Sequence, residues 1–162
     1  MRNQFSVKKM VLLAMLAAVA YMMVSLIRVP IVLFLKYEPK DVIITIGGFL
    51  LGPMASFVIS LVVSLLEMVT VSDTGPIGAL MNLLSTCAFA CTASLVYKKC
   101  HKLKGAILGL AAGSAFMVCA MLLWNWLITP LYMGVSREQV EGMLIPVFLP
   151  FNALKAGFNS AL

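Results

Sequence analysis

Charged side chains are scarce in this sequence. Aspartate, glutamate, lysine and arginine make up 11% of its 162 residues, whereas hydrophobic residues make up 62%, and the mean hydropathy is +1.05. A soluble domain carries about 25% charged residues, so the composition excludes that class. The sequence predicts an integral protein of the cell membrane.

The residues that catalysis and metal binding require are also few. The single histidine, His101, lies among the lysines of Lys98–Lys104, where a solvated side chain is expected, and no serine or cysteine has a base nearby. The four cysteines form no Cys-x-x-Cys pair, and no glycine-rich phosphate loop is present. We therefore expect no enzyme, no metal site, no nucleic-acid binding and no ATP hydrolysis by this chain itself.

Long apolar runs are what the sequence does contain. We expect one all-α membrane domain over 1–162, a six-transmembrane-helix bundle with helices at approximately 10–27, 41–51, 53–71, 77–97, 104–129 and 142–162. The first run lacks a small-residue cleavage site, which favours a spanning helix over a signal peptide. Because apolar sequence continues to Leu162, we expect the last helix to be truncated there.

Basic residues set the expected orientation. One cluster, Arg2, Lys8 and Lys9, precedes the first helix, and a second, Lys98–Lys104, follows the fourth. The positive-inside rule places both in the cytoplasm, which requires an even number of crossings between them. Splitting 41–71 at the Gly-Pro pair gives four crossings and a cytoplasmic N-terminus. The acidic residues then fall on or near the outer face: Glu38, Asp41, Glu67, Asp73, Glu138 and Glu141.

The link from Arg28 to Asp41 is long and carries both charge signs. Such a link can fold over a cavity as a lid, or it can be an interfacial connector. We interpret Asp41 as the N-cap of the next helix. For Glu38, the residues leave a binding role and a connector role open.

Lys155 interrupts the last apolar run. An ionisable group at membrane depth costs about 3 kcal/mol on insertion scales, so it marks a substrate or ion site by default; snorkelling to the interface is the alternative. Asn152 lies three residues earlier, on the same helix side.

Asn125, between two tryptophans, offers amide donors and an acceptor. Asn82 either binds a ligand or bonds a neighbouring helix. Trp126 and Tyr132 are interpreted as an aromatic belt.

The first helix carries a small-xxx-small pair, Ala14 and Ala18, which lets another helix approach closely. Packing within the chain and docking of a partner protein both fit this spacing.

Together these segments resemble the substrate-binding S component of energy-coupling factor (ECF) vitamin transporters, and most closely the riboflavin-specific members. The residues that carry the resemblance are Ala14-xxx-Ala18, Phe34 to Asp41, Gly47 to Pro53, Gly75-Pro76-Ile77-Gly78-xxx-Asn82, Asn125 and Pro150-Phe151-Asn152-xx-Lys155. The likeness covers nearly the whole chain.

The resemblance implies six helices that enclose the vitamin near the extracellular side, under the first long loop. It implies that Asn125, Asn152 and Lys155 hydrogen-bond the ligand, that Glu38 contacts the ribityl chain or pairs with Lys155, and that Asp41 and Asn82 contribute. It further implies riboflavin as transported ligand rather than cofactor, and docking through Ala14 and Ala18 onto an ECF module, a transmembrane scaffold driven by two ATPases.

Two alternatives remain at this point. The first is an S component for another vitamin or small metabolite. The second is a self-sufficient channel or secondary transporter, in which Lys155 and an acidic residue form an ion path.

Overall fold

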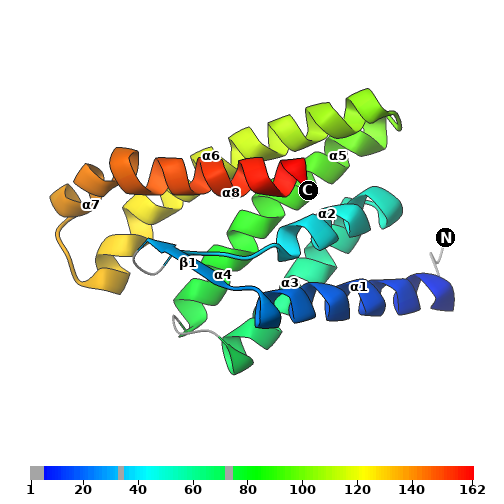
Figure 1. The fold of residues 1–162 in the computed structure, drawn as a ribbon, viewed down its shortest axis with the longest axis horizontal. Helices are drawn as coiled ribbons and strands as arrows, with labels where there is room; N and C mark the ends of the chain where they lie inside the picture. The colour runs from blue at the N-terminus through cyan, green and yellow to red at the C-terminus, as the bar shows by residue number, and fades with distance from the viewer. Residues whose placement is uncertain (1–5, 33–34, 72–74) are drawn as a thin grey trace.

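A computed structural model describes residues 6–32, 35–71 and 75–162. Arg2, Phe34 and Asp73, which entered the expectations above, lie outside these ranges. The described chain forms a bundle of six helical segments (Figure 1), which confirms the predicted all-α membrane fold. The segments are α1 (Val7–Leu26), α2 (Lys40–Leu51), α3 (Pro53–Thr70), α4 (Gly75–Thr86) with α5 (Thr92–Lys99), α6 (Leu103–Met133), and α7 (Arg137–Met143) with α8 (Leu149–Ala161).

Two of these segments contain a turn of wider π-helix. The first, Cys87–Cys91, joins α4 to α5, and the second, Leu144–Phe148, joins α7 to α8. Pro146 lies within the second turn, and Pro150 is the second residue of α8. Because proline has no N–H to donate, it disturbs the regular bond ladder. Four helices within the described residues are long and apolar enough to span a membrane: Val7–Leu26, Pro53–Thr70, Gly75–Lys99 and Leu103–Met133.

The run over residues 41–71 is divided into two helices by Gly52. This glycine has φ of 97°, a left-handed value that other residues rarely adopt, and Pro53 then opens α3. α2 has 12 residues, about 18 Å at 1.5 Å per residue, which is too short for the hydrocarbon core. α2 is instead surrounded by α1, α3, α5 and the first π-turn.

The link after α1 holds secondary structure that the all-α expectation missed. Strands β1 (Val29–Val32) and β2 (Leu35–Tyr37) form an antiparallel hairpin in which Val29 pairs with Tyr37. The β-branched residues of β1 favour extended backbone, but two such short runs gave too weak a pattern to predict.

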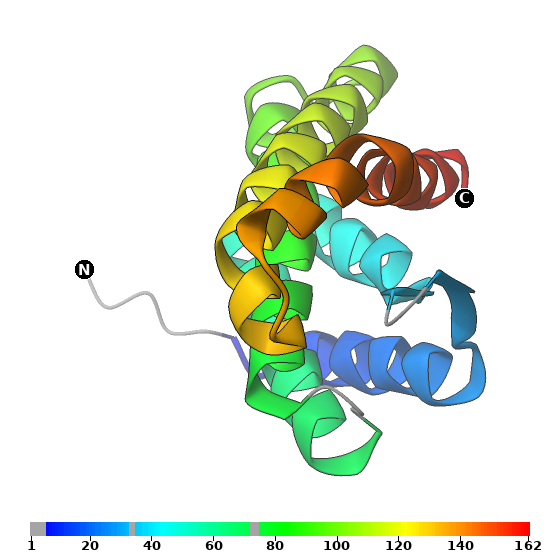
Figure 2. The ribbon, with the colours of Figure 1, turned by 90° about the vertical axis from the view of Figure 1, so that its left-hand side faces the viewer.

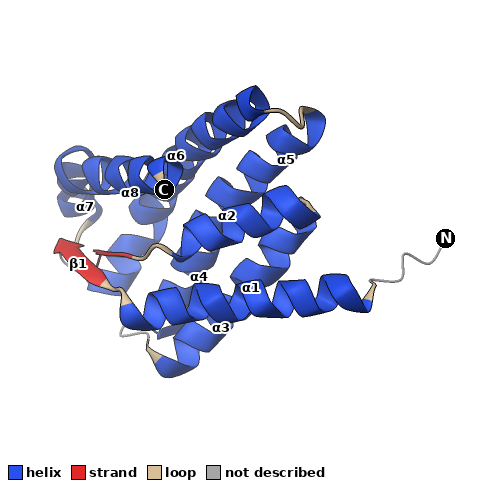
Figure 3. Ribbon diagram, turned by 45° about the vertical axis from the view of Figure 1, so that its right-hand side comes forward, coloured by secondary structure: helices blue, strands red, loops and turns tan. Residues whose placement is uncertain are grey.

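The two ends of the bundle differ in what they carry. The hairpin and α7 lie at one end, called the hairpin end below, and the start of α1, the α2–α3 turn and the α5–α6 connection lie at the other (Figures 1 and 3). The lysines that begin α1 and those around the α5–α6 connection therefore share one end, which we call the basic end. The positive-inside argument required this placement.

α6 packs against α5 and the first π-turn through glycines spaced four apart. A Cβ atom on Gly109 would lie 2.6 Å from the carbonyl oxygen of Ala93, and one on Gly113 would lie 2.6 Å from that of Phe89. Only glycine permits so close an approach of two helix backbones. The same buried stripe continues along α6 every fourth residue: Gly105, Gly109, Gly113, Met117, Met121, Asn125 and Thr129.

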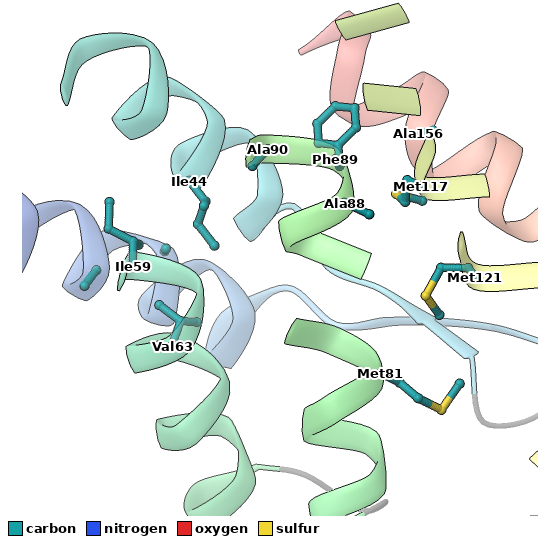
Figure 4. Packing of buried hydrophobic residues seen from close by; sticks show 12 residues of the cluster. Ile44, Ile59, Val63, Met81, Ala88, Phe89, Ala90, Met117, Met121 and Ala156 are labelled. Carbon is teal, nitrogen blue, oxygen red and sulfur yellow. The ribbon is translucent and has the colours of Figure 1, made fainter. Parts of the chain in front are cut away.

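A core of small and flexible apolar side chains fills the centre of the bundle. Ile44 and Ile59 meet on one side of it, and Phe89 and Met117 on the other (Figure 4). Met81 on α4 and Met121 on α6 lie at its edge in the same view. These two methionines also line the cavity described next, so the core and the cavity share a wall.

Candidate functional site

A cavity of about 70 Å³ lies at the hairpin end, between the hairpin, α4, α6 and α8. Figure 2 looks onto this end of the bundle. The cavity mixes apolar side chains with amides, hydroxyls and charged groups, as small-molecule sites do. Its lining residues are Arg28, Leu35, Lys36, Glu38, Gly78, Met81, Asn82, Ser85, Met121, Tyr132, Phe151, Asn152 and Lys155.

α8 contributes the buried polar pair that the sequence singled out. Asn152 and Lys155 are 1% and 5% exposed, and both line the cavity. One amide N–H of Asn152 donates to the carbonyl oxygen of Phe148 at 2.8 Å. This bond fixes the orientation of the carboxamide. Among the described residues, its oxygen and second N–H are not used in another hydrogen bond, so both can serve a ligand.

Lys155 is held by groups from two other helices. Its Nζ lies 3.3 Å from Oδ2 of Asp41 and donates to Oγ of Ser85 at 3.3 Å. The resemblance left Glu38 either as a ribityl contact or as the partner of Lys155. Among the described contacts, the carboxylate within ion-pair distance of Lys155 belongs to Asp41, so the second alternative is not the one formed. An ion pair of this kind compensates part of the cost of burying its two members.

Asp41 connects three helices and does not cap its own. Pro39 is the N-cap residue of α2, without a side-chain cap bond, so the N-cap interpretation of Asp41 is wrong. The Asp41 carboxylate accepts hydrogen bonds from Thr86 Oγ1 at 2.6 Å and from Asn159 Nδ2 at 3.0 Å. With Lys155, these contacts satisfy a side chain that is fully buried.

A second network lies beside the first and fixes Glu38. Its carboxylate accepts from Nε of Arg28 at 2.7 Å and from Nζ of Lys40 at 2.8 Å. Lys40 also donates to Glu67, and Asn82 Nδ2 donates to Glu67 Oε2 at 3.0 Å. Arg28 additionally donates to the carbonyl oxygen of Val71 at the end of α3. The hairpin is thereby tied to α2, α3 and α4.

The charges of the two networks cancel. Glu38 lies between β2 and α2, outside the helices; burial alone would raise the pKa of its carboxyl, but Lys40, Lys155 and Arg28 hold that pKa below its ordinary value. The Glu38 carboxylate is therefore ionised at neutral pH. Three cations, Arg28, Lys40 and Lys155, face three anions, Glu38, Asp41 and Glu67.

Known proteins resemble this chain along nearly its whole length. The family model "ECF transporter, substrate-specific component" matches residues 8–162. The chain belongs to this family. As an S component it is 26% identical to the riboflavin transporter FmnP of Bacillus subtilis (strain 168), over 92% of this chain and 84% of that protein. It is 27% identical to the riboflavin transporter RibU of Staphylococcus aureus (strain TCH60), over 91% and 82%.

A solved structure supports the same assignment. The structure described as "Structure and mechanism of the S component of a bacterial ECF transporter" is 27% identical, covers 95% of this chain and 89% of its own, and superposes with a TM-score of 0.81. The recognition of an ECF S component from short sequence motifs is thus confirmed, and so is its role in transport.

In this S component, four of the six predicted contact residues line the cavity: Glu38, Asn82, Asn152 and Lys155. Asp41 does not line the cavity, but it forms an ion pair with Lys155, which does. Asn125 does not line the cavity: its amide donates to the carbonyl oxygen of Met121 at 2.7 Å and accepts from Thr129 Oγ1 at 3.0 Å. Asn125 therefore lies one helical turn from a lining residue, Met121, with both functions of its amide engaged.

Several lining residues of the S component were missed. Tyr132 lines the cavity, although it was interpreted as part of an aromatic belt; it follows Asn125 by seven residues, which is two helical turns on the same side. Ser85 follows Gly78 by the same interval on α4.

Trp126 does not line the cavity. Its indole N–H donates to Glu141 at 2.9 Å, and the guanidinium carbon of Arg137 lies 5.3 Å from the centre of the Trp126 ring.

Proposed function

We propose that this S component captures riboflavin from the extracellular side and delivers it for ATP-driven uptake through a partner ECF module. It acts as a binding subunit and not as an enzyme. The observation that carries the proposal is the meeting of Asn152, Lys155 and Asn82 in one buried cavity of a chain whose curated relatives are riboflavin transporters.

The hydrogen-bonding groups of the cavity match one edge of a flavin. The flavin ring system ends in an imide, an N–H flanked by two carbonyl groups. Lys155 supplies a donor, and the Asn152 carboxamide supplies an acceptor beside a donor. Met81, Met121 and Phe151 supply the apolar surface that the ring requires.

The cavity has to widen before such a ligand enters. A volume of about 70 Å³ is far below the roughly 300 Å³ or more of typical ligand pockets. Leu35, Lys36 and Glu38 cover it from the hairpin segment, which is held by the ion pair between Arg28 and Glu38. We propose that release of this pair lets the hairpin move outward and admit riboflavin.

The orientation follows from the charges at the two ends. We propose that the basic end lies in the cytoplasm, because anionic lipid and the positive-inside bias favour it there. The hairpin end then faces the exterior, where the vitamin is captured. The N-terminus is cytoplasmic in this arrangement.

Riboflavin binding to purified protein tests the proposal. Quenching of flavin fluorescence should give saturable binding, and Asn152→Ala and Lys155→Ala should each weaken it by about tenfold or more, because a buried bond to a charged or amide group is worth about 1–3 kcal/mol. Lys104→Ala, which removes a lysine at the opposite end, should leave the affinity unchanged.

The variants Asn152→Ala and Lys155→Ala differ in how much they disturb the fold. Lys155→Ala leaves Asp41 without its cation, so its folding has to be checked by thermal unfolding. Asn152→Ala leaves that ion pair intact. If both folded variants bind riboflavin as tightly as the native chain, the site assignment fails; if the native chain is stabilised by another vitamin and not by riboflavin, the ligand assignment fails.

A further inference from the structure

A second and larger cavity lies at the basic end, away from the riboflavin site. Its volume is about 480 Å³, and α1, α2, α3, α5 and the segments that follow α2 and α5 contribute to it. Nothing in the proposed capture of riboflavin requires it. The lining residues are Lys9, Leu13, Gly48, Phe49, Leu50, Leu51, Gly52, Pro53, Met54, Ala55, Ser94, Tyr97, Lys98 and His101.

The charged groups that line this cavity share one sign. Lys9 comes from α1 and Lys98 from the last turn of α5, and none of the lining residues is acidic. His101, from the α5–α6 connection, adds an imidazole to the lining. Other lysines of the same end, Lys102 and Lys104 among them, do not line it. The cavity therefore gathers a particular subset of the basic residues, beyond what membrane topology alone requires.

One wall of the cavity is aromatic. The ring centres of Phe49 and Tyr97 lie 4.6 Å apart, and Tyr97 meets His101 edge-on at 5.3 Å. Apolar side chains complete the lining, including Leu13, Leu50 and Met54. Amphipathic rings of this kind are enriched at the level of lipid headgroups.

Helix dipoles do not reverse the sign set by the lysines. At Gly52 the C-terminal end of α2 and the N-terminal end of α3 meet. Their partial charges are opposite, so the two contributions largely cancel. The basic side chains therefore determine that the cavity attracts anions.

We propose that this cavity binds the phosphate-bearing headgroup of an anionic phospholipid. The phosphate lies between Lys9 and Lys98, and the start of an acyl chain lies along Leu13 and Met54. Basic pockets between transmembrane helices on the cytoplasmic side bind anionic headgroups in this way. A soluble anion would contact the lysines but not the apolar side chains of the lining, so the lining favours a lipid. The assignment to the cytoplasmic leaflet rests on the orientation proposed above; the chemistry of the cavity does not.

Lipid titration of matched variants tests this site. The protein in neutral detergent is titrated with dioleoylphosphatidylglycerol, with dioleoylphosphatidylcholine and with inorganic phosphate, while thermal unfolding and native mass spectrometry are recorded. Phosphatidylglycerol should raise the unfolding midpoint and remain bound at one per chain. Lys9→Gln combined with Lys98→Gln should weaken its binding by roughly tenfold or more, since each lysine near an anionic headgroup adds to the attraction. Lys102→Gln combined with Lys104→Gln removes the same charge outside the cavity and should change little.

Three results would overturn the lipid site. Equal weakening in both double variants would mean diffuse attraction, and an equal effect of inorganic phosphate would mean a soluble anion. Unchanged lipid binding in the Lys9/Lys98 variant, together with loss of co-purification with the ECF module, would mean that a protein occupies the cavity. Riboflavin affinity, measured on the same samples, should not change, so failure of this site is distinguishable from failure of the riboflavin proposal.

Discussion

At the scale of single residues, the pairing of Lys155 with Asp41 decides how the candidate site is built. The two side chains are 5% and 0% exposed, so neither can exchange its partner for bulk water. A buried ion pair gives little net stability, but removal of one partner leaves a charge without compensation, at about 3 kcal/mol or more. The pair therefore fixes the position of Lys155 in the cavity, and substitution of either member is expected to lower the free energy of unfolding.

A double-mutant cycle tests this pairing. Asp41→Asn is expected to lower the free energy of unfolding by about 3 kcal/mol, and Lys155→Met by a similar amount because it leaves Asp41 uncompensated. Asp41→Asn combined with Lys155→Met should cost clearly less than the sum of the single changes, because it removes both charges. Thermal or denaturant unfolding in detergent gives the values, and Glu138→Gln on exposed α7 serves as control. Additive costs would contradict the pairing.

The sequence predicted the local half of this site but not the distant half. Asn152 and Lys155 were predictable as a pair because a spacing of three places two residues on one side of a helix. The partners of Lys155 come from α2 and α4, and no local pattern tells which helix sides meet. The resemblance offered Glu38 as one possible partner, whereas packing supplies Asp41.

At the scale of secondary-structure elements, the glycine stripe of α6 sets its distance from α5. A methyl group on Gly109 would overlap a backbone carbonyl of α5, which cannot move aside as a flexible side chain can. The four-residue spacing of these glycines is visible in the sequence, but their partner helix is not. The hairpin was missed for a related reason. Its two strands are too short to show a clear sequence pattern of their own, and they are stabilised by pairing with each other and by packing over the cavity.

Two glycine substitutions separate packing from helix propensity. Gly109→Ala should destabilise the protein by about 1–3 kcal/mol, because overpacking forces the helices apart. Gly157→Ala lies in α8, where nothing approaches within 4 Å of the added Cβ, so it should be neutral or stabilise by up to about 1 kcal/mol. Unfolding midpoints of both variants check this. Equal destabilisation would show that α6 does not depend on close approach at Gly109.

At the scale of the whole molecule, α1 has one side in the bundle and one side free. Ala17, Ala20 and Val24 are buried against the other helices, whereas Ala14 and Ala18 are exposed. The small pair is therefore not used for packing within the described chain. This arrangement favours the second interpretation of the spacing, in which Ala14 and Ala18 receive a helix of the ECF module.

Enlarging the exposed pair should separate capture from uptake. Ala14→Leu combined with Ala18→Leu leaves the riboflavin site untouched, so the affinity for riboflavin should not change. Close approach of a partner helix is blocked, so co-purification with the ECF module and riboflavin uptake by cells should fall at least tenfold. Ala111→Leu combined with Ala115→Leu repeats the spacing on exposed positions of α6 and should leave both intact. Because the control differs only in the helix that carries it, loss of uptake in the α6 variant and not in the α1 variant would move the docking surface from α1 to α6.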